Sequence, residues 1–469
     1  MSCSVNVGRG RIAVLAVAVL LGLPVSVLAQ EPTGPPPINQ ADTAWMLVAT
    51  ALVLLMTPAL AFFYGGLVRS KNALNTMMMS IVALGFVGVI WAVVGYSLAF
   101  APGNNWIGDL SRFGLRSVTL DAQGTIPHLL FMAFQGTFAI ITAALISGAI
   151  VERMRFSAYV LFISLWAIAV YSPIAHWVWG GGWLAKLGAL DFAGGTVVHV
   201  NAGAAALVAA MVVGKRQQYP SSALLPHNVP FTLLGAGLLW FGWFGFNAGS
   251  AVAANGIAAL AFTTTMLAPA ATLVVWTFLD SFRSRKPTAV GAATAIVVGL
   301  VAVTPAAGYV SPMSAIALGA IAAVPSYLAL IWRAKSSLDD SLDVVAAHGV
   351  GGTVGALLTG VFAQKSLNGV ADGVLFGNPG QFAIQAAAVF AAMAYSGIMT
   401  FVLLKIVSLV LPLRATADDE GTGLDLSLHG EEAYLHEGSG GAGLASAQTS
   451  GMAVPVASHV LTVSHPEMR

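Results

Sequence analysis

Charged residues and cysteine are both scarce in this sequence. Asp, Glu, Lys and Arg together make up 8% of the 469 residues, whereas roughly 25% is usual in proteins. So little charge excludes a disordered chain, a coiled coil and a soluble enzyme with one small core. The single cysteine, Cys3, lies in an N-terminal segment that we expect to be removed. Disulfides, cysteine-ligated zinc and a cysteine nucleophile are therefore excluded from the mature chain.

Basic residues are also too few for a nucleic-acid surface, because the formal net charge is only +1. What the sequence has in abundance is hydrophobicity, since 57% of its residues are hydrophobic. Apolar stretches long enough to cross a bilayer recur along most of the chain. The sequence therefore predicts an all-α polytopic membrane protein that contacts lipid and no nucleic acid.

The N-terminus has the three parts of a secretory signal peptide. Arg9 and Arg11 precede an apolar run over residues 12–25, and residues 27–29 offer small side chains at a cleavage site. We expect residues 1–29 to be this signal peptide. The alternative is a first membrane helix.

Eleven further membrane spans are predicted, which divide into two inverted five-helix repeats plus one helix. Inverted repeats mark many transport proteins. We expect one membrane domain over residues 30–413 and a polar cytoplasmic tail over 414–469, with 435–469 disordered. The spans lie at roughly 43–65, 74–100, 127–151, 156–177, 191–213, 229–248, 253–280, 288–308, 313–332, 342–363 and 381–411.

The loops between the spans differ in their content of Lys and Arg. If residue 40 lies outside the membrane, most of these basic residues fall in inner loops. Such a bias sets orientation in membrane proteins. We therefore expect an external N-terminus after signal cleavage and a cytoplasmic C-terminus.

Two histidines are predicted to lie deep in the membrane. His199 is about 12 Å in from the outer boundary of span five, and His348 about 9 Å in from the inner boundary of span ten. In a hydrocarbon core of about 30 Å both approach the middle from opposite sides. Two neutral imidazoles there could form a hydrogen-bonded pair that accepts and donates protons. The alternatives are two separately satisfied core histidines or a bis-histidine haem site.

Acidic residues stand at the starts of the same two spans. Asp191 begins span five, where a carboxylate caps the backbone N–H groups and suits the positive end of a helix. The alternative is a direct cation ligand, although a capping aspartate can also act indirectly by orienting its neighbours. Asp343 invites the same capping interpretation at span ten. Glu152 and Arg153, at the end of span three, are interpreted as charges at the inner membrane border.

Aromatic residues gather at the predicted outer ends of the spans. Trp179 follows span four, Phe134 and Phe138 lie one helical turn apart in span three, and residues 243–250 close span six with the sequence WFGFNAGS. Aromatic faces beside a hydroxyl group can hold a small cation. The alternative is an ordinary interfacial aromatic belt with core phenylalanines.

Several segments taken in order are similar to one family. The chain resembles the ammonium transporters (Amt/Mep, related to Rh proteins), of the bacterial Amt type, over about residues 40–435. The segments that carry this resemblance are FYGGLVR at 63–69, HWVWGGG at 176–182, DFAGGTVVHVNAG at 191–203, GWFGFNAGS at 242–250 and DVVAAHGVGG at 343–352.

The resemblance implies a role for each site residue. Phe138, Trp179 and Ser250 would recruit ammonium at the outer face, with Asp191 as structural support. Phe138 and Phe246 would form a stacked gate below them. The pore would be lined by His199, His348, Trp243 and Phe134. The family also implies a homotrimer with one pore per subunit.

The tail resembles the segment that engages PII-type nitrogen regulators. It departs from the family at Thr422, where a glutamate is usual before the Gly-Leu-Asp at 423–425, and in the extension after Tyr434. Binding of a PII-type protein is an expectation from resemblance alone.

The sequence as a whole predicts a transporter that moves ammonium, or ammonia plus a proton, across the inner membrane into the cell. No enzymatic activity, cofactor or metal is expected. One rival is an ammonium sensor that signals through its tail. The other is a polytopic haem or redox enzyme.

Overall fold

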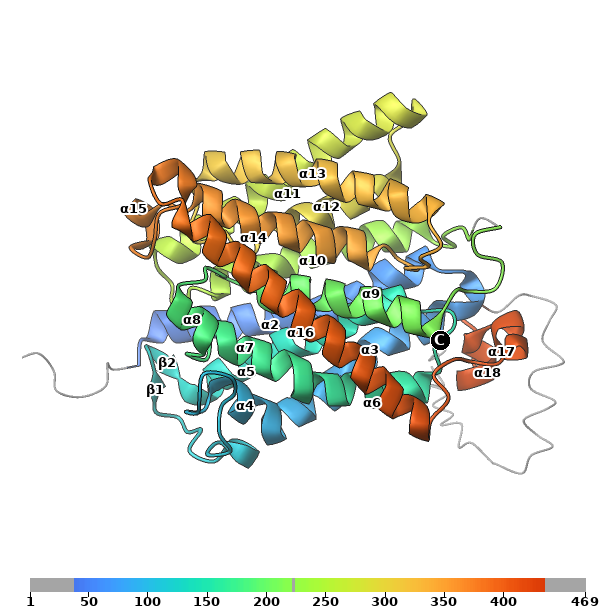
Figure 1. The fold of residues 1–469 in the computed structure, drawn as a ribbon, viewed down its shortest axis with the longest axis horizontal. Helices are drawn as coiled ribbons and strands as arrows, with labels where there is room; N and C mark the ends of the chain where they lie inside the picture. Colours follow the sequence, from blue (N-terminus) through green and yellow to red (C-terminus); the bar gives the residue numbers. More distant parts are fainter. Residues whose placement is uncertain (1–37, 222–223, 435–469) are drawn as a thin grey trace, which may run out of the picture.

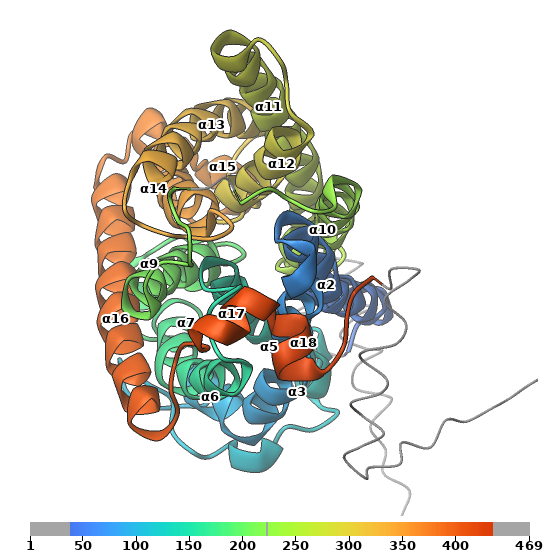
Figure 2. The same ribbon diagram turned by 90° about the vertical axis from the view of Figure 1, so that its right-hand side faces the viewer.

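The computed structural model describes residues 38–221 and 224–434, which form a bundle of long helices lying side by side (Figure 1). A short hairpin of strands β1 (Ala122–Gln123) and β2 (Ile126–Pro127) marks one end of the bundle, the hairpin end. Helices α17 (Ala417–Thr422) and α18 (Leu424–His429) cover part of the other, the tail end (Figure 2). The predicted signal peptide and the extension after residue 434 lie outside the described residues.

Helices account for nearly all of the regular structure, because a backbone surrounded by hydrocarbon must satisfy its own hydrogen bonds. The longer α-helices are α2 (Gln40–Leu67), α3 (Ala73–Ile90), α5 (His128–Ile146), α6 (Phe156–Trp166), α9 (Asn201–Val213), α10 (Val229–Gly249), α11 (Gly256–Ser284), α12 (Ala289–Val303), α13 (Pro312–Lys335), α14 (Gly351–Phe362) and α16 (Gly380–Val410). The short ones are α4 (Tyr96–Phe100), α7 (Ser172–Val178), α8 (Trp183–Leu187) and α15 (Lys365–Asn368).

The described residues also include four π-helical segments and four short 3₁₀ turns. The π segments are η2 (Trp91–Gly95), η5 (Ala167–Tyr171), η6 (Gly195–Val200) and η7 (Val345–Val350), and the 3₁₀ turns are η1 (Ser70–Asn72), η3 (Phe113–Leu115), η4 (Ser147–Ala149) and η8 (Val374–Phe376). π segments inside helices often mark functional sites. Two of the four, η6 and η7, carry the predicted histidine pair.

Ten helices of the described part of the chain are long and apolar enough to cross a membrane, at ten of the eleven predicted positions. The remaining position, 288–308, is helical only over α12, which has 15 residues. Residues 304–309 continue as turns. Pro305 explains the early end of α12, since proline lacks the N–H that continues a helix.

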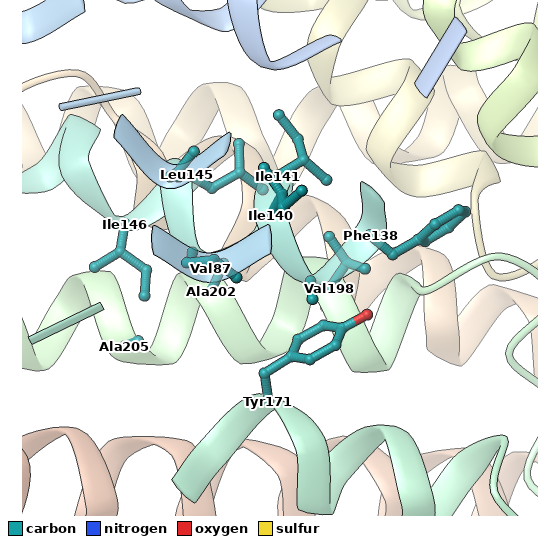
Figure 3. Close-up of a cluster of buried hydrophobic side chains, with 14 of the residues drawn as sticks. Val87, Phe138, Ile140, Ile141, Leu145, Ile146, Tyr171, Val198, Ala202 and Ala205 are labelled. Atoms are coloured by element: carbon teal, nitrogen blue, oxygen red, sulfur yellow. The ribbon is translucent and has the colours of Figure 1, made fainter. Parts of the chain in front are cut away.

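The centre of the bundle is closely packed around α5 (Figure 3). Ile141 and Ile146 of α5 and Val198 of η6 are almost completely buried, as are Ala202 and Ala205 of α9. The alanines let α9 approach α5 closely, as small residues do between membrane helices. Phe138 of α5 belongs to this buried cluster, and the packing holds it in position.

Glu152 and Arg153, which the sequence placed at the inner membrane border, are both buried at the tail end of the bundle. Glu152 accepts hydrogen bonds from Arg69 Nε at 2.8 Å, Asn72 Nδ2 at 2.8 Å and Arg216 Nη1 at 2.6 Å. Burial alone would raise the pKa of Glu152, but the two arginines outweigh it and lower that pKa below its ordinary value. Loops from three parts of the chain are joined by this one carboxylate.

The tail folds back on the same end of the bundle. Asp425 of α18 accepts hydrogen bonds from the N–H groups of Leu74 at 3.0 Å and Asn75 at 2.7 Å, at the start of α3. Lys71 donates to the carbonyl oxygens of Glu420 at 2.9 Å and Gly421 at 2.5 Å. A residue 350 positions further along the chain thus caps the free N–H groups at the N-terminus of α3.

Candidate functional site

A cavity of about 300 Å³ opens at the hairpin end. It brings together Phe138, Trp179 and Ser250, which the sequence placed on three separate spans. The rings of Phe138 and Trp179 meet edge to face with centroids 5.9 Å apart. The full lining is Phe100, Phe131, Gln135, Phe138, Val178, Trp179, Phe192 and Ser250.

Hydrogen bonds orient two polar groups of this hairpin-end cavity. The Ser250 hydroxyl donates to the carbonyl oxygen of Phe246 at 2.8 Å, so its lone pairs stay available to accept. Gln135 is 9% exposed, and its Oε1 has no hydrogen-bond partner within the described residues. Both groups can therefore accept hydrogen bonds from a cation that carries N–H donors.

Sequence reasoning missed Gln135. The signal was present, since Gln135 precedes Phe138 by three residues and side chains at that spacing share a helix face. Phe134 also belongs to α5, but it lines neither this cavity nor the central cavity described next. Its ring centroid lies 4.9 Å from that of Phe138, so Phe134 supports the neighbouring ring from behind.

The rings of Phe138 and Phe246 stack with centroids 4.1 Å apart and an interplanar angle of 27°. Phe138 lines the hairpin-end cavity, whereas Phe246 lines a central cavity of only about 10 Å³. That volume is about enough for one water molecule. The stacked pair therefore separates a roomy, polar-rimmed space from a narrow one.

Aliphatic side chains and five rings line the central cavity. The ring of His199 stacks on that of Trp243, with centroids 5.4 Å apart. Trp243 Nε1 donates to Thr304 Oγ1 at 2.8 Å, which leaves the indole face toward the cavity. The lining is Met56, Leu60, Phe63, Ile141, Leu145, Val198, His199, Leu239, Trp243, Phe246, Val297 and His348.

The two histidines contact each other directly. Their Nδ1 atoms lie 3.1 Å apart, and both side chains are buried. One Nδ1 must donate and the other accept, so the two rings are in opposite tautomers. Consequently one Nε2 is a donor and the other an acceptor. His199 Nε2 has no partner among the described residues.

A close approach of two glycines brings the histidines together. Gly203 stands one helical turn after His199, and Gly349 follows His348. A Cβ atom on Gly203 would lie 2.3 Å from the Cα of Gly349, far inside contact distance. Only a residue without a side chain fits at this crossing.

Asp191 caps the start of η6. Its Oδ1 accepts from the N–H groups of Gly194 at 2.9 Å and Gly195 at 2.6 Å, and its Oδ2 from Thr196 at 2.9 Å and Val197 at 3.0 Å. With four N–H donors on the carboxylate, the capping interpretation fits better than direct cation ligation.

The same turn reaches the hairpin-end cavity. Trp179 Nε1 donates to the backbone carbonyl of Asp191 at 2.9 Å. Gly194 adopts a left-handed φ of 113°, and a Cβ there would lie 3.2 Å from the Trp179 ring. Asp191 therefore holds the turn against which Trp179 rests.

A vestibule of about 430 Å³ opens at the tail end. It shares Phe63, Val297 and His348 with the central cavity, so the two spaces lie next to each other. Asp280, Arg283, Arg333 and Asp343 are among its charged lining residues.

The capping prediction for Asp343 was wrong. Asp343 has a φ of 60° and accepts a hydrogen bond from Arg333 Nε at 2.7 Å. Asp340 instead accepts from the N–H of Val345 at 2.7 Å, at the start of η7. The left-handed turn at Asp343 directs its carboxylate away from the helix, which the sequence spacing did not reveal.

The chain thus contains a cavity at each end of the bundle. Between them lie the stacked phenylalanine pair and the buried histidine pair. The profile of the Ammonium Transporter Family matches residues 44–434. The chain belongs to this family. The resemblance inferred from the sequence segments is confirmed.

Individual relatives of this family agree. An ammonium transporter of Bacillus subtilis is 50% identical over 402 residues, covering 85% of this chain and 99% of the relative. Ammonium transporter Amt1 of Archaeoglobus fulgidus is 45% identical over 398 residues, covering 85% of this chain and all of the relative.

Solved structures of the family share the fold. The crystal structure of Saccharomyces cerevisiae Mep2 matches with a TM-score of 0.76 at 38% identity, over 81% of this chain and 91% of that one. A structure described as a sensor Amt protein matches with a TM-score of 0.78 at 31% identity, over 83% of this chain and 98% of that one.

Proposed function

We propose that this chain carries ammonium across the cytoplasmic membrane through the path formed by the two end cavities and the central cavity. This proposal rests on the order of the cavities and rings from the hairpin end to the tail end. A cavity with aromatic faces and hydrogen-bond acceptors leads through the Phe138–Phe246 stack to the histidine pair, and from there to the tail-end vestibule.

At the hairpin end, Trp179 and Phe138 offer ring faces and Ser250 offers an acceptor. A small cation that donates several hydrogen bonds is matched by this combination. Gln135 Oε1 adds a second acceptor. Ammonium recruitment at this cavity follows from its chemistry as well as from the family.

Below the stack, the narrow apolar space excludes a charged ion, because dehydration of a charge at membrane depth is costly. Loss of a proton from ammonium lets a neutral molecule pass. Potassium cannot lose a proton and is rejected. The acceptor Nε2 and donor Nε2 of the histidine pair suit either the passage of ammonia or the relay of the proton.

The test of the recruitment step uses Trp179→Leu and Ser250→Ala. Loss of a cation–π contact or of an acceptor should weaken uptake of methylammonium by about two- to fivefold at low concentration, with little change at saturation. Uptake by proteoliposomes across a range of concentrations measures this. An unchanged concentration dependence in both variants would contradict an outer recruitment site.

The membrane arrangement is part of the proposal. We propose eleven spans with α12 as the eighth, a cleaved signal peptide, an outer hairpin end and a cytoplasmic tail end in the inner membrane. Two inverted five-helix repeats are supported by η6 and η7, since each is a π segment that carries a histidine near the start of the last span of its repeat.

The proposed assembly and regulation are supported by the family to which the chain belongs. We propose a homotrimer, in which neighbouring subunits cover part of the apolar helix faces exposed in the single chain. The tail, folded against the start of α3, is the proposed contact for a PII-type regulator. Residues 423–434 support this contact, although Thr422 departs from the usual glutamate.

The transporter is favoured over the ammonium sensor. Two short helices, α17 and α18, make up the regular structure of the tail in the described region. The family match extends to residue 434 and ends within this tail.

A further inference from the structure

We propose that Asp42, at the start of α2, is a positioning residue that holds together the two arms of the ammonium recruitment site. One arm is α5, which carries Phe138 and Gln135, and the other is the turn that carries Ser250. This inference rests on the proposed recruitment of ammonium at the hairpin-end cavity, which Asp42 itself does not line.

Both oxygens of the Asp42 carboxylate have partners far away in the sequence. Oδ1 accepts from the N–H of Ala254 at 2.8 Å, and Oδ2 accepts from the Thr125 hydroxyl at 2.5 Å. These partners are 212 and 83 residues away along the chain. The side chain is 7% exposed, so water competes little for either bond.

The turn that carries Ser250 needs an external hydrogen bond to hold it, because its backbone conformation is strained. Between α10 and α11 the chain turns at residues 250–255, and Val252 adopts a φ of 53°. For a β-branched residue this left-handed conformation is unfavourable and persists only when the surroundings enforce it. The bond from Ala254 to Asp42 lies two residues after Val252 and fixes the far side of the turn.

The α5 arm is held through the hairpin. Thr125 lies in the turn between β1 and β2, and β2 leads directly into α5 at His128. The backbone reinforces this link, since the N–H of Asn39 donates to the carbonyl oxygen of Thr125 at 2.8 Å. Asp42 therefore sets the spacing between the start of α5 and the Ser250 turn.

The experiment measures methylammonium uptake by proteoliposomes as half-saturating concentration and maximal rate. Asp42→Ala should raise the half-saturating concentration about tenfold and keep the maximal rate within about twofold, as expected when binding is lost and the pore is kept. Asp42→Asn should stay close to the wild type, because an amide oxygen can accept from Ala254 while the amide nitrogen donates to Thr125.

Two further variants separate positioning from general stability. Ser311→Ala removes the side-chain cap of another helix, α13, without touching either link, and it should leave the half-saturating concentration unchanged. Thr125→Val removes one link and should raise the half-saturating concentration about two- to threefold, a loss matching one ordinary hydrogen bond.

A lower maximal rate in Asp42→Ala with an unchanged half-saturating concentration would overturn the inference. If Asp42→Ala does not fold, Thr125→Val provides the test. An unchanged half-saturating concentration in Thr125→Val would then overturn the inference. Ser250→Ala serves as the reference. If Ser250→Ala shifts the concentration dependence but the Asp42 and Thr125 variants do not, only this inference fails. If Ser250→Ala and Trp179→Leu also cause no shift, the recruitment site itself is wrong.

Discussion

The contact between His199 and His348 requires the two rings to be in opposite tautomers. Replacing either by alanine leaves a buried Nδ1 without its partner, at a cost of about 1–3 kcal/mol. If the pair relays a proton, each alanine variant should lower the ammonium-evoked current about 100-fold, in line with other proton-transfer groups. Currents evoked by ammonium and by potassium in matched proteoliposomes measure this.

The currents carried by ammonium and by potassium distinguish a proton relay from simple pore lining by the histidine pair. Wild-type ammonium current and continued rejection of potassium in both alanine variants would contradict the relay and leave the histidines as pore lining. His199→Asp is the complementary variant. It should keep transport but admit potassium, because a carboxylate can stabilise a dehydrated cation.

Asp191 accepts four N–H bonds with two oxygens, and its substitutions separate capping from charge. Asparagine offers one carbonyl oxygen, so Asp191→Asn should keep about half of the bonds and show intermediate uptake and thermal stability. Asp191→Ala should abolish transport and destabilise the protein by about 0.5–2 kcal/mol, the usual cost of a lost helix cap. Uptake and melting temperature are measured on the same preparations. Full activity in Asp191→Asn would show that the negative charge is dispensable.

At the scale of elements, the crossing of α9 with η7 depends on Gly203. A methyl group there would overlap the Gly349 backbone, and a buried overlap of this kind costs about 1–3 kcal/mol. Gly203→Ala should therefore separate the histidines and sharply reduce the ammonium current.

Gly397 of α16 provides the matched control. A Cβ there would lie 3.6 Å from Val208 Cγ2, an ordinary contact, so Gly397→Ala should behave as the wild type. Equal currents from the two alanine variants would show that the glycine crossing does not control the histidine pair.

For the whole molecule, Glu152 joins the loops at the tail end. Glu152→Ala removes the carboxylate that Arg216 and Arg69 share, and because Arg216 keeps its ion pair with Asp339 it should destabilise the protein by about 1–3 kcal/mol. Thermal unfolding in detergent measures the loss. Glu152→Gln keeps the size of the side chain and should cost less.

The lowered pKa of Glu152 gives this network a pH dependence of known sign. Its contribution to stability is fully present above the ordinary pKa of 4.5 and is lost as the pH falls through the lower pKa of the folded state. The wild type should therefore lose stability on acidification more steeply than Glu152→Gln. If the melting temperatures of the wild type and Glu152→Gln fall in parallel from pH 7 to about pH 3, Glu152 is not the source of this pH dependence.

The sequence by itself determined the class of protein and the family, and ten of its eleven predicted spans coincide with helices of the described residues that are long and apolar enough to cross a membrane. Hydrophobic length and the motifs around His199 and His348 suffice for these, because both are local properties of the chain. It also supplied the correct capping prediction for Asp191, since a cap acts within a few residues of its own position.

Only the tertiary structure decided the contacts between distant segments. Which segments the fold brings together decided the burial of Glu152, the capping by Asp340 instead of Asp343, and the bridge made by Asp42. It also left Gln135 Oε1 without a partner among the described residues. A buried polar group must find partners wherever the fold brings them, and sequence spacing carries no information about partners 83 or 212 residues away.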